Sequence, residues 1–186
     1  ECLASTGQQP RGVLHRGLTL GDISLTLRAP NGDRVGLCGV VPCPSIPEAG
    51  VVWMVATDDI YQHQTTFLRN SKKALQELSE DYLVLFNCVD ARNTVHIKWL
   101  RWMGFTFINE HPNYGAEKRL FYEFVRKIMC DPATAITVVK GVTAVAGVAA
   151  SVEKTNNKTS DIPIMLQLQK THIFLKPNKK IYVHAS

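Results

Sequence analysis

A buried strand, an amphipathic helix and a second buried strand follow one another in the middle of the chain. Residues 50–57 form a continuous apolar run of strand length, as expected for a strand that is covered on both faces. Apolar residues at helical spacing predict a helix over 60–79, and residues 82–89 form the next apolar strand. Because a helix that joins two buried strands is typical of a crossover within one sheet, this order predicts a sheet with helices packed on it.

The residues before this unit predict a surface helix and a hairpin. Residues 5–21 carry a few apolar side chains among polar ones and end at a glycine, which is typical of a short surface helix. Residues 23–28 alternate between apolar and polar, and after Asn31-Gly32 the apolar run 35–41 follows, so we expect a β-hairpin. The proline-rich segment 42–47 is predicted to be a loop.

The residues after the unit return from helix to strand. Asn93 can cap a helix that runs to Met103 and stops at a glycine. Residues 105–108 and 120–125 are predicted strands, separated by a polar loop. The expected fold is α/β, or α+β: a mixed central sheet flanked by helices, antiparallel at its start and crossing over by helices later.

Composition excludes several classes of protein. With 186 residues and 20.7 kDa there is room for one domain and an appendage. An apolar share of 45% with 20% charged residues excludes a disordered chain. The five cysteines are an odd number without a C-x-x-C pair, which disfavours a disulfide scaffold or a metal site and favours a reducing compartment.

The positive charge is concentrated near the carboxyl end. The net charge is +5, and residues 128–186 carry 7 basic against 3 acidic residues. Because the basic residues of the body alternate with acidic ones, we predict no specific nucleic-acid partner. Residues 133–151 are apolar with one charge, so they form either a helix that packs on a partner or a membrane contact. We therefore divide the chain into a domain at 1–127, an apolar helix at 128–152 and a linker with an irregular or short-strand tail at 153–186.

Two stretches of sequence resemble known proteins. The segment from Asn87 to Phe105 resembles the strand, Asn-capped helix and Gly-Phe ending of the GNAT superfamily of N-acetyltransferases, and Asn93 and Gly104 match that pattern. A longer set of segments is similar to the acetyltransferase-like internal virion proteins of short-tailed bacteriophages; it comprises residues 53–57, 93–97, 112–115 and 121–125. The resemblance covers roughly residues 20–127 and implies a GNAT-like fold, with the fold's first strand expected in a missing start before Glu1.

The resemblance implies an acetyl-CoA site, and the spacing of Cys and His residues predicts no metal. The resemblance assigns contact with the cofactor to Met54, Val55, Ala56, Thr57 and Asn93. The family also places a glycine-rich turn at a helix N-terminus, where backbone N–H groups approach the pyrophosphate. This chain has no glycine between Gly50 and Gly104, and its turn begins with two carboxylates, of which Asp58 could instead cap the helix.

The chemical step of the family needs a base for the amine and an acid near the departing sulfur. The family often supplies the acid as a Tyr seven residues after the capping Asn, where this chain has Leu100. The candidates to replace it are His63, His96, Glu110 and Tyr114.

The resemblance and these departures from it imply two hypotheses. The first is a virion-associated GNAT-fold protein with weak or absent catalysis, which serves assembly or genome ejection, contacts other virion or tail proteins, and resides in the virion or, during assembly, in the host cytoplasm. The alternative is an acetyl-CoA-dependent N-acetyltransferase that acts on an amine. The segment that starts at Met129 also resembles the opening of a channel-forming virion protein, so residues 129–186 could be a fused neighbour.

Overall fold

A seven-stranded mixed sheet runs through the residues that this computed structural model describes, which are 1–46, 48–128 and, for the backbone, 179–182. The strand order is β5-β6-β4-β3-β2-β1-β7. The β3/β4 and β1/β7 pairs are parallel and the other pairs are antiparallel. The strands are β1 (Ile23–Arg28), β2 (Arg34–Pro42), β3 (Ala49–Ala56), β4 (Val84–Asp90), β5 (Thr106–Tyr114), β6 (Arg119–Lys127) and β7 (Lys179–Tyr182).

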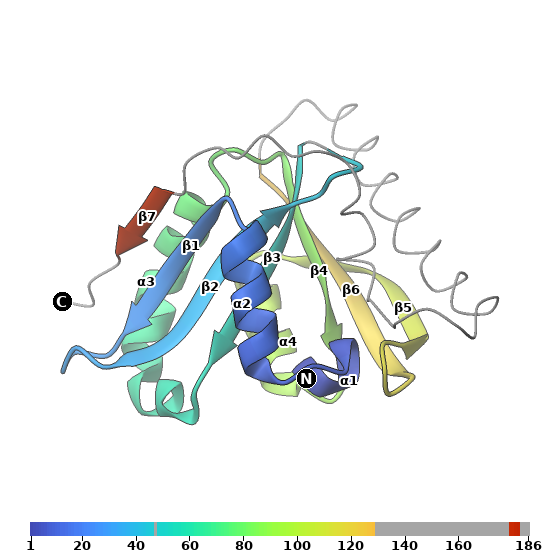
Figure 1. Cartoon of the computed structure of the whole chain (residues 1–186), viewed down its shortest axis with the longest axis horizontal. Helices are drawn as coiled ribbons and strands as arrows, with labels where there is room; N and C mark the ends of the chain where they lie inside the picture. The colour runs from blue at the N-terminus through green and yellow to red at the C-terminus, as the bar shows by residue number, and fades with distance from the viewer. Residues whose placement is uncertain (47, 129–178, 183–186) are drawn as a thin grey trace.

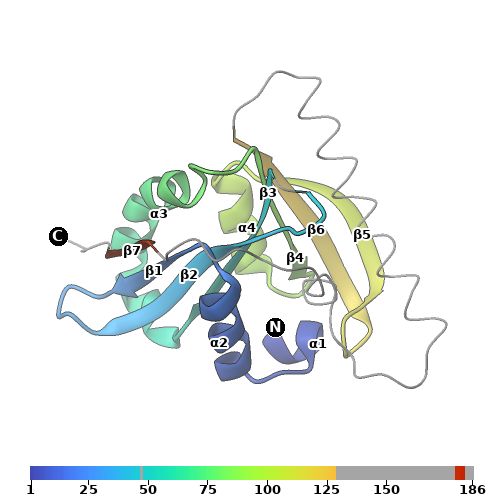
Figure 2. The same cartoon turned by 45° about the horizontal axis from the view of Figure 1, so that its top comes forward.

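Helices cover both faces of the sheet. Figures 1 and 2 show α1 and α2 on one face and α3 and α4 on the other. The helical segments are α1 (Cys2–Thr6), α2 (Pro10–Leu20), the 3-10 helix η1 (Asp58–His63), α3 (Gln64–Leu78) and α4 (Thr94–Trp102). The expectation of a mixed sheet flanked by helices is confirmed.

The main core lies between the sheet and the α3/α4 layer. Leu25, Val40 and Leu85 are fully buried on the sheet, and Leu75 and Leu78 cover them from α3. The alternation that predicted the hairpin and the helical spacing that predicted α3 both supply this core, because each places apolar side chains on a single face.

A glycine brings α2 close to the other face of the sheet. A Cβ atom at Gly17 would lie 2.6 Å from Cε2 of Trp53, so the indole of Trp53 on β3 can lie directly against the helix backbone. A Cβ at Gly39 on β2 would lie 2.9 Å from Cζ2 of the same indole. The absence of two side chains thus creates the slot that holds Trp53.

The predicted cap of α4 is confirmed. Oδ1 of Asn93 accepts a hydrogen bond from the backbone N–H of His96 at 3.1 Å. Gly104 follows the helix with φ of 86°, a left-handed conformation that favours glycine.

The prediction of one helix over residues 5–21 is wrong, because two helices occupy this region. Gly7 ends α1 in the left-handed conformation, with φ of 67°. Pro10 then begins α2 at its first position, where a missing N–H costs nothing.

Two other boundaries also differ from the predictions. The helix expected over 60–79 begins as η1 and becomes α-helical only at Gln64. The strand expected over 105–108 continues as β5 to Tyr114, through Pro112. Among the described strands β5 pairs only with β6, so it lies at an edge, where a proline that lacks an N–H is tolerated.

The expectations for the carboxyl-terminal part fall almost entirely outside the described residues. They concern the apolar helix at 128–152, with its core at 133–151, and the tail at 153–186, of which only the strand β7 is described. Within the described residues, no helix has the length and apolar character needed to cross a membrane.

Candidate functional site

The strands β3 and β4 part in the middle of the sheet. Their pairing ends at Val51 and Phe86, although β3 continues to Ala56 and β4 to Asp90. In Figure 1 the two strands meet at the top and separate downwards, towards α1. Nδ2 of Asn87 donates to the carbonyl of Val52 at 2.7 Å, so an amide bridges the strands directly where they begin to part.

One edge of β3 faces the gap between the strands. The carbonyl of Val52 points towards β4, because Asn87 binds it. Backbone N–H and C=O groups point to alternate sides along a strand, so those of Met54 and Ala56 also point towards β4. The backbone N–H of Thr57 points the other way, towards β2, where it donates to the carbonyl of Val35 at 2.9 Å. Beyond Val52, this edge has no partner strand among the described elements.

A cavity of about 380 Å³ fills the gap and reaches both faces of the sheet. On one side Glu1, Cys2 and Ser5 of the α1 region line it. On the other side Phe67 and Ser71 of α3 do so. The volume is in the range of small-molecule sites in proteins.

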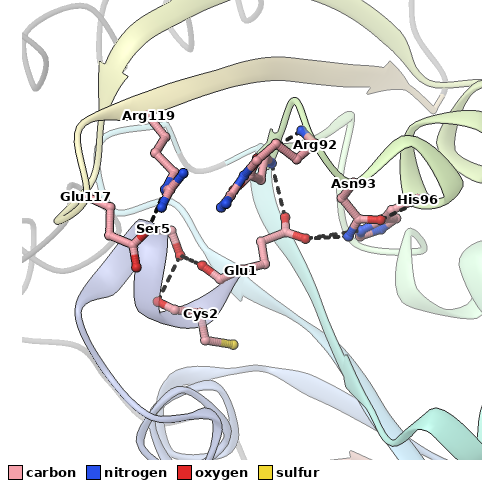
Figure 3. Close-up of polar contacts among 9 residues, drawn as sticks. Glu1, Cys2, Ser5, Arg92, Asn93, His96, Glu117 and Arg119 are labelled. Atoms are coloured by element: carbon pink, nitrogen blue, oxygen red, sulfur yellow. Dashed lines mark hydrogen bonds and ion pairs between the residues drawn. The ribbon is translucent and has the colours of Figure 1, made fainter.

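A carboxylate, an amide and an imidazole from the lining of the cavity meet one another (Figure 3). Oε2 of Glu1 accepts from Nδ2 of Asn93 at 2.6 Å and lies 3.9 Å from Nδ1 of His96. Oε1 of Glu1 accepts from the backbone N–H of Asp90 at 3.3 Å. Burial alone would raise the pKa of Glu1, but the contacts with His96 and Asn93 outweigh it, so this pKa lies below its usual value and the carboxylate is ionised at neutral pH.

Polar contacts also dock α1 against the tip of the β5/β6 hairpin. The backbone N–H of Glu117 donates to the carbonyl of Ala4 at 3.2 Å. Gly115 has φ of 70°, and a Cβ there would lie 2.5 Å from the same carbonyl oxygen. The hairpin therefore holds α1, and with it Glu1, over the opening of the sheet.

A tyrosine and a thiol form a second polar group in the wall of the cavity. Burial raises the pKa of Cys88 to about 12, the nearby Glu123 carboxylate adds to the rise, and a hydrogen bond from Tyr114 offsets part of it. The ring of Tyr114 lies 4.8 Å from that of Phe121 and 5.9 Å from that of His111. The thiol is consequently neutral and a poor nucleophile, and the tyrosine is the polar side chain that the hairpin presents to the cavity.

A fully buried carboxylate supports this hairpin from behind. Oε2 of Glu123 accepts from Nδ2 of Asn109 at 2.8 Å and lies 3.1 Å from Nε2 of His111. Oε1 of Glu123 has no hydrogen-bond partner among the described residues. These contacts tie β5 to β6 below Tyr114.

The turn after β3 leaves the start of α3 without a cap. The N-cap residue is His63, the last residue of η1, and no side chain makes a cap hydrogen bond there. Asp58 makes no cap hydrogen bond either, so it does not cap the helix as the sequence allowed. Asp59 instead accepts from the hydroxyl of Thr57 at 3.0 Å.

The structure gathers most of the predicted site residues around the cavity. Its lining includes Met54, Val55, Ala56, Asn93, His63, His96 and Tyr114. Thr57 is exposed and does not line it, and the alternation described above turns the backbone of Val55 towards β2. Glu110 is exposed on β5 and likewise lies outside the lining.

Sequence reasoning missed two members of the site. The sequence does single out Asn87, since a polar residue within an apolar strand indicates a specific role for its side chain. No feature of the sequence indicates that Glu1 belongs to the site, because Glu1 contacts Asn93 only through the docking of α1. Leu100, where the resemblance expects a tyrosine, is 2% exposed and lines the cavity.

No group of three or more His, Cys, Asp and Glu side chains among the described residues could hold a metal ion. No family model and no curated protein matches the chain.

Solved structures do match it. A Bacillus subtilis acetyltransferase in complex with CoA aligns with a TM-score of 0.53 and 9% identity, over 64% of this chain and 85% of that one. A spermidine N-acetyltransferase chimera from Vibrio cholerae aligns with a TM-score of 0.47 and 9% identity, over 55% of this chain. An acetyltransferase of the GNAT family from Streptococcus pneumoniae aligns with a TM-score of 0.43 and 17% identity, over 53%. This chain spans 65% and 62% of the last two structures. At such identities the likeness concerns the fold, and the described part of this chain has the GNAT fold.

Proposed function

We propose that this protein is an acetyl-CoA-dependent N-acetyltransferase that acts on an amine. The observation that carries the proposal is the parting of β3 and β4 around a cavity, with one edge of β3 left without a partner strand. Backbone N–H and C=O groups on such an edge need partners, and the amide-containing pantetheine arm of acetyl-CoA supplies both donors and acceptors.

The residues present fit the pantetheine arm better than the pyrophosphate. Backbone groups of Met54 and Ala56 would bind the arm within the gap. No side chain caps the start of α3, but η1 runs directly into it, so no separate helix N-terminus is presented to a phosphate there. Asp58 and Asp59 lie in the preceding turn, are exposed, and oppose an anion there. We therefore expect binding that depends more on the arm than on the phosphates.

His96 is the side chain best placed to take a proton from the amine. Its Nδ1 faces Oε2 of Glu1, which leaves Nε2 as the atom that accepts the proton. Glu1 and Asn93 act as positioning residues, since one lies beside the ring and the other caps its helix. Bound acetyl-CoA supplies the thioester carbonyl that the amine attacks.

Tyr114 is the candidate proton donor. It lines the cavity, whereas Leu100 has no proton to give. The stacking on Phe121 and the contact with Cys88 fix the ring, so the hydroxyl is held in place before any substrate arrives.

Two measurements on the purified full chain test the proposal. We expect acetyl-CoA at a hundred times its Kd to stabilise the fold by about 2.7 kcal/mol, and free adenosine nucleotides to have a much smaller effect. We also expect CoA release that depends on a primary amine, and a loss of about 10²-fold or more in kcat for His96→Gln with an unchanged Kd for acetyl-CoA. The proposal is refuted if millimolar acetyl-CoA neither shifts the melting temperature nor supports transfer to a broad panel of amines.

A second candidate is the non-catalytic, virion-associated component that the bacteriophage resemblance implies. Leu100 in place of the expected tyrosine and the turn without glycine favour it. In this proposal the fold serves assembly or genome ejection and binds other virion proteins, in the virion or in the host cytoplasm. The test is an immunoblot of purified particles from an infected host. Absence of the chain from mature particles would count against this candidate.

A further inference from the structure

The cavity continues past the gap between the strands into an apolar compartment beneath α3. This compartment is lined by Ala74, Leu75, Leu78, Leu100, Met103 and Phe124. Each of these side chains is less than a tenth exposed, so the compartment lies in the core and not on the surface.

Polar groups stop at the entrance to this compartment. Oγ of Ser71 accepts from Nε1 of Trp99 at 3.3 Å and donates to the carbonyl of Phe67 at 2.7 Å. These polar atoms are thereby satisfied by one another. The compartment's own side chains are aliphatic or aromatic except for the thioether of Met103, and a space lined in this way does not hold water well.

The lining is longer than an acetyl group requires. It follows α3 from Ser71 at its entrance to Leu78, which at the rise of an α-helix is about 10 Å. Protein interiors normally contain few voids larger than a water molecule. An apolar space of this length, continuous with the gap between β3 and β4, is shaped for an aliphatic chain.

We propose that the acyl group of the donor is an aliphatic chain longer than acetyl, and that this acyl chain lies in the compartment beneath α3. The inference rests on the proposed transfer of an acyl group from CoA to an amine, and it replaces acetyl-CoA by a longer acyl-CoA as the preferred donor. Leu100 then has a role of its own, because it forms an apolar wall where a tyrosine would be polar. The reaction balances as for acetyl: the amine nitrogen bonds to the thioester carbonyl carbon, the C–S bond breaks, and the proton lost by the amine ends on the CoA thiol.

The test compares CoA, acetyl-CoA, butyryl-CoA and octanoyl-CoA by calorimetric titration of the full wild-type chain. Each methylene group that is buried strengthens binding about fourfold, so we expect the Kd of octanoyl-CoA to be at least about tenfold below that of acetyl-CoA. Equal Kd values for the acyl series would overturn this inference and leave the proposed function standing. Failure of every compound to bind would overturn both.

Variants of α3 test where the acyl chain lies. Ala74→Phe fills the compartment, and we expect it to abolish the preference for octanoyl-CoA while the Kd for acetyl-CoA changes by less than about twofold. Gln76→Phe adds the same ring to the exposed face of the same helix and should retain the preference. Ala74→Leu is a milder filling variant should the phenylalanine prevent folding. A preference for octanoyl-CoA that survives in the folded filling variant would refute the assignment.

Discussion

The amide of Asn87 closes the point where β3 and β4 part, and its removal should be costly. Nδ2 donates to the carbonyl of Val52 and Oδ1 accepts from the backbone N–H of Cys88, both at 2.7 Å. Asn87→Ala deletes both bonds at a half-buried position. A hydrogen bond contributes about 0.5–1.5 kcal/mol net. We therefore expect the free energy of unfolding to fall by about 2 kcal/mol and Tm by about 4–8 °C in a chain of this size.

Urea unfolding followed by circular dichroism measures this loss. Asn113→Ala is the matched control, because Asn113 is exposed on the hairpin and the same truncation there should change stability by less than about 0.5 kcal/mol. If Asn87→Ala also loses less than about 0.5 kcal/mol, the amide does not hold the strands and our account of the parting is wrong.

The substitution Asn87→Asp separates the two hydrogen bonds. A carboxylate can still accept from the N–H of Cys88, but it places a negative charge against the carbonyl of Val52. Protonation of that carboxyl restores a donor. Relative to wild type at the same pH, we expect this variant to be less destabilised at pH 4 than at pH 7. The opposite order would indicate that the bond to Val52 contributes nothing.

Three further outcomes are expected. Gly17→Ala gains about 1 kcal/mol in helix propensity but drives a Cβ into the indole of Trp53, so we expect a net loss of about 1–2 kcal/mol in chemical denaturation. Burial raises the pKa of Cys38 and of Cys88 to about 12, so the unfolded thiols ionise first as pH rises above about 9, and stability should fall by about 3 kcal/mol between pH 8 and pH 10. The Cys38→Ala/Cys88→Ala variant should show a smaller fall, which the raised pKa values of Cys2 and Cys43 still cause. For the same reason iodoacetamide at pH 8 should label Cys88 about a thousandfold more slowly in the native than in the urea-unfolded chain, as mass spectrometry would measure.

Local patterns in the sequence were sufficient for most of the elements. Alternation, helical spacing and the cap at Asn93 each depend on residues a few positions apart, and the structure has the corresponding hairpin, helix and cap. The errors have local physical causes too. Gly7 and Pro10 divide the first helix. The polar residues after 108 predict a loop, but β5 continues through them to Tyr114, because an edge strand tolerates Pro112.

The site was less predictable because contacts over long stretches of sequence build it. Glu1 meets Asn93 only after α1 docks on the hairpin, and Tyr114 reaches the cavity only because β5 extends further than its apolar run. Nothing in the residues near His96 indicates that a carboxylate will face its ring.

The parting of β3 and β4 is itself a property of the whole sheet. β3 remains paired with β2 as far as Ala56, and β4 remains paired with β6 as far as Asp90. Each strand therefore follows its outer neighbour, and the two halves of the sheet separate beyond Val51 although both strands continue.

A site built in this way presents backbone groups to its ligand, and backbone groups are supplied by almost any residue. Sequence can change widely around a retained fold, as the 9% identity to a CoA-bound acetyltransferase of the same fold illustrates. We expect two side chains to distinguish the proposed chemistry of this chain: Asn87, where β3 and β4 part, and Leu100 in the wall of the cavity.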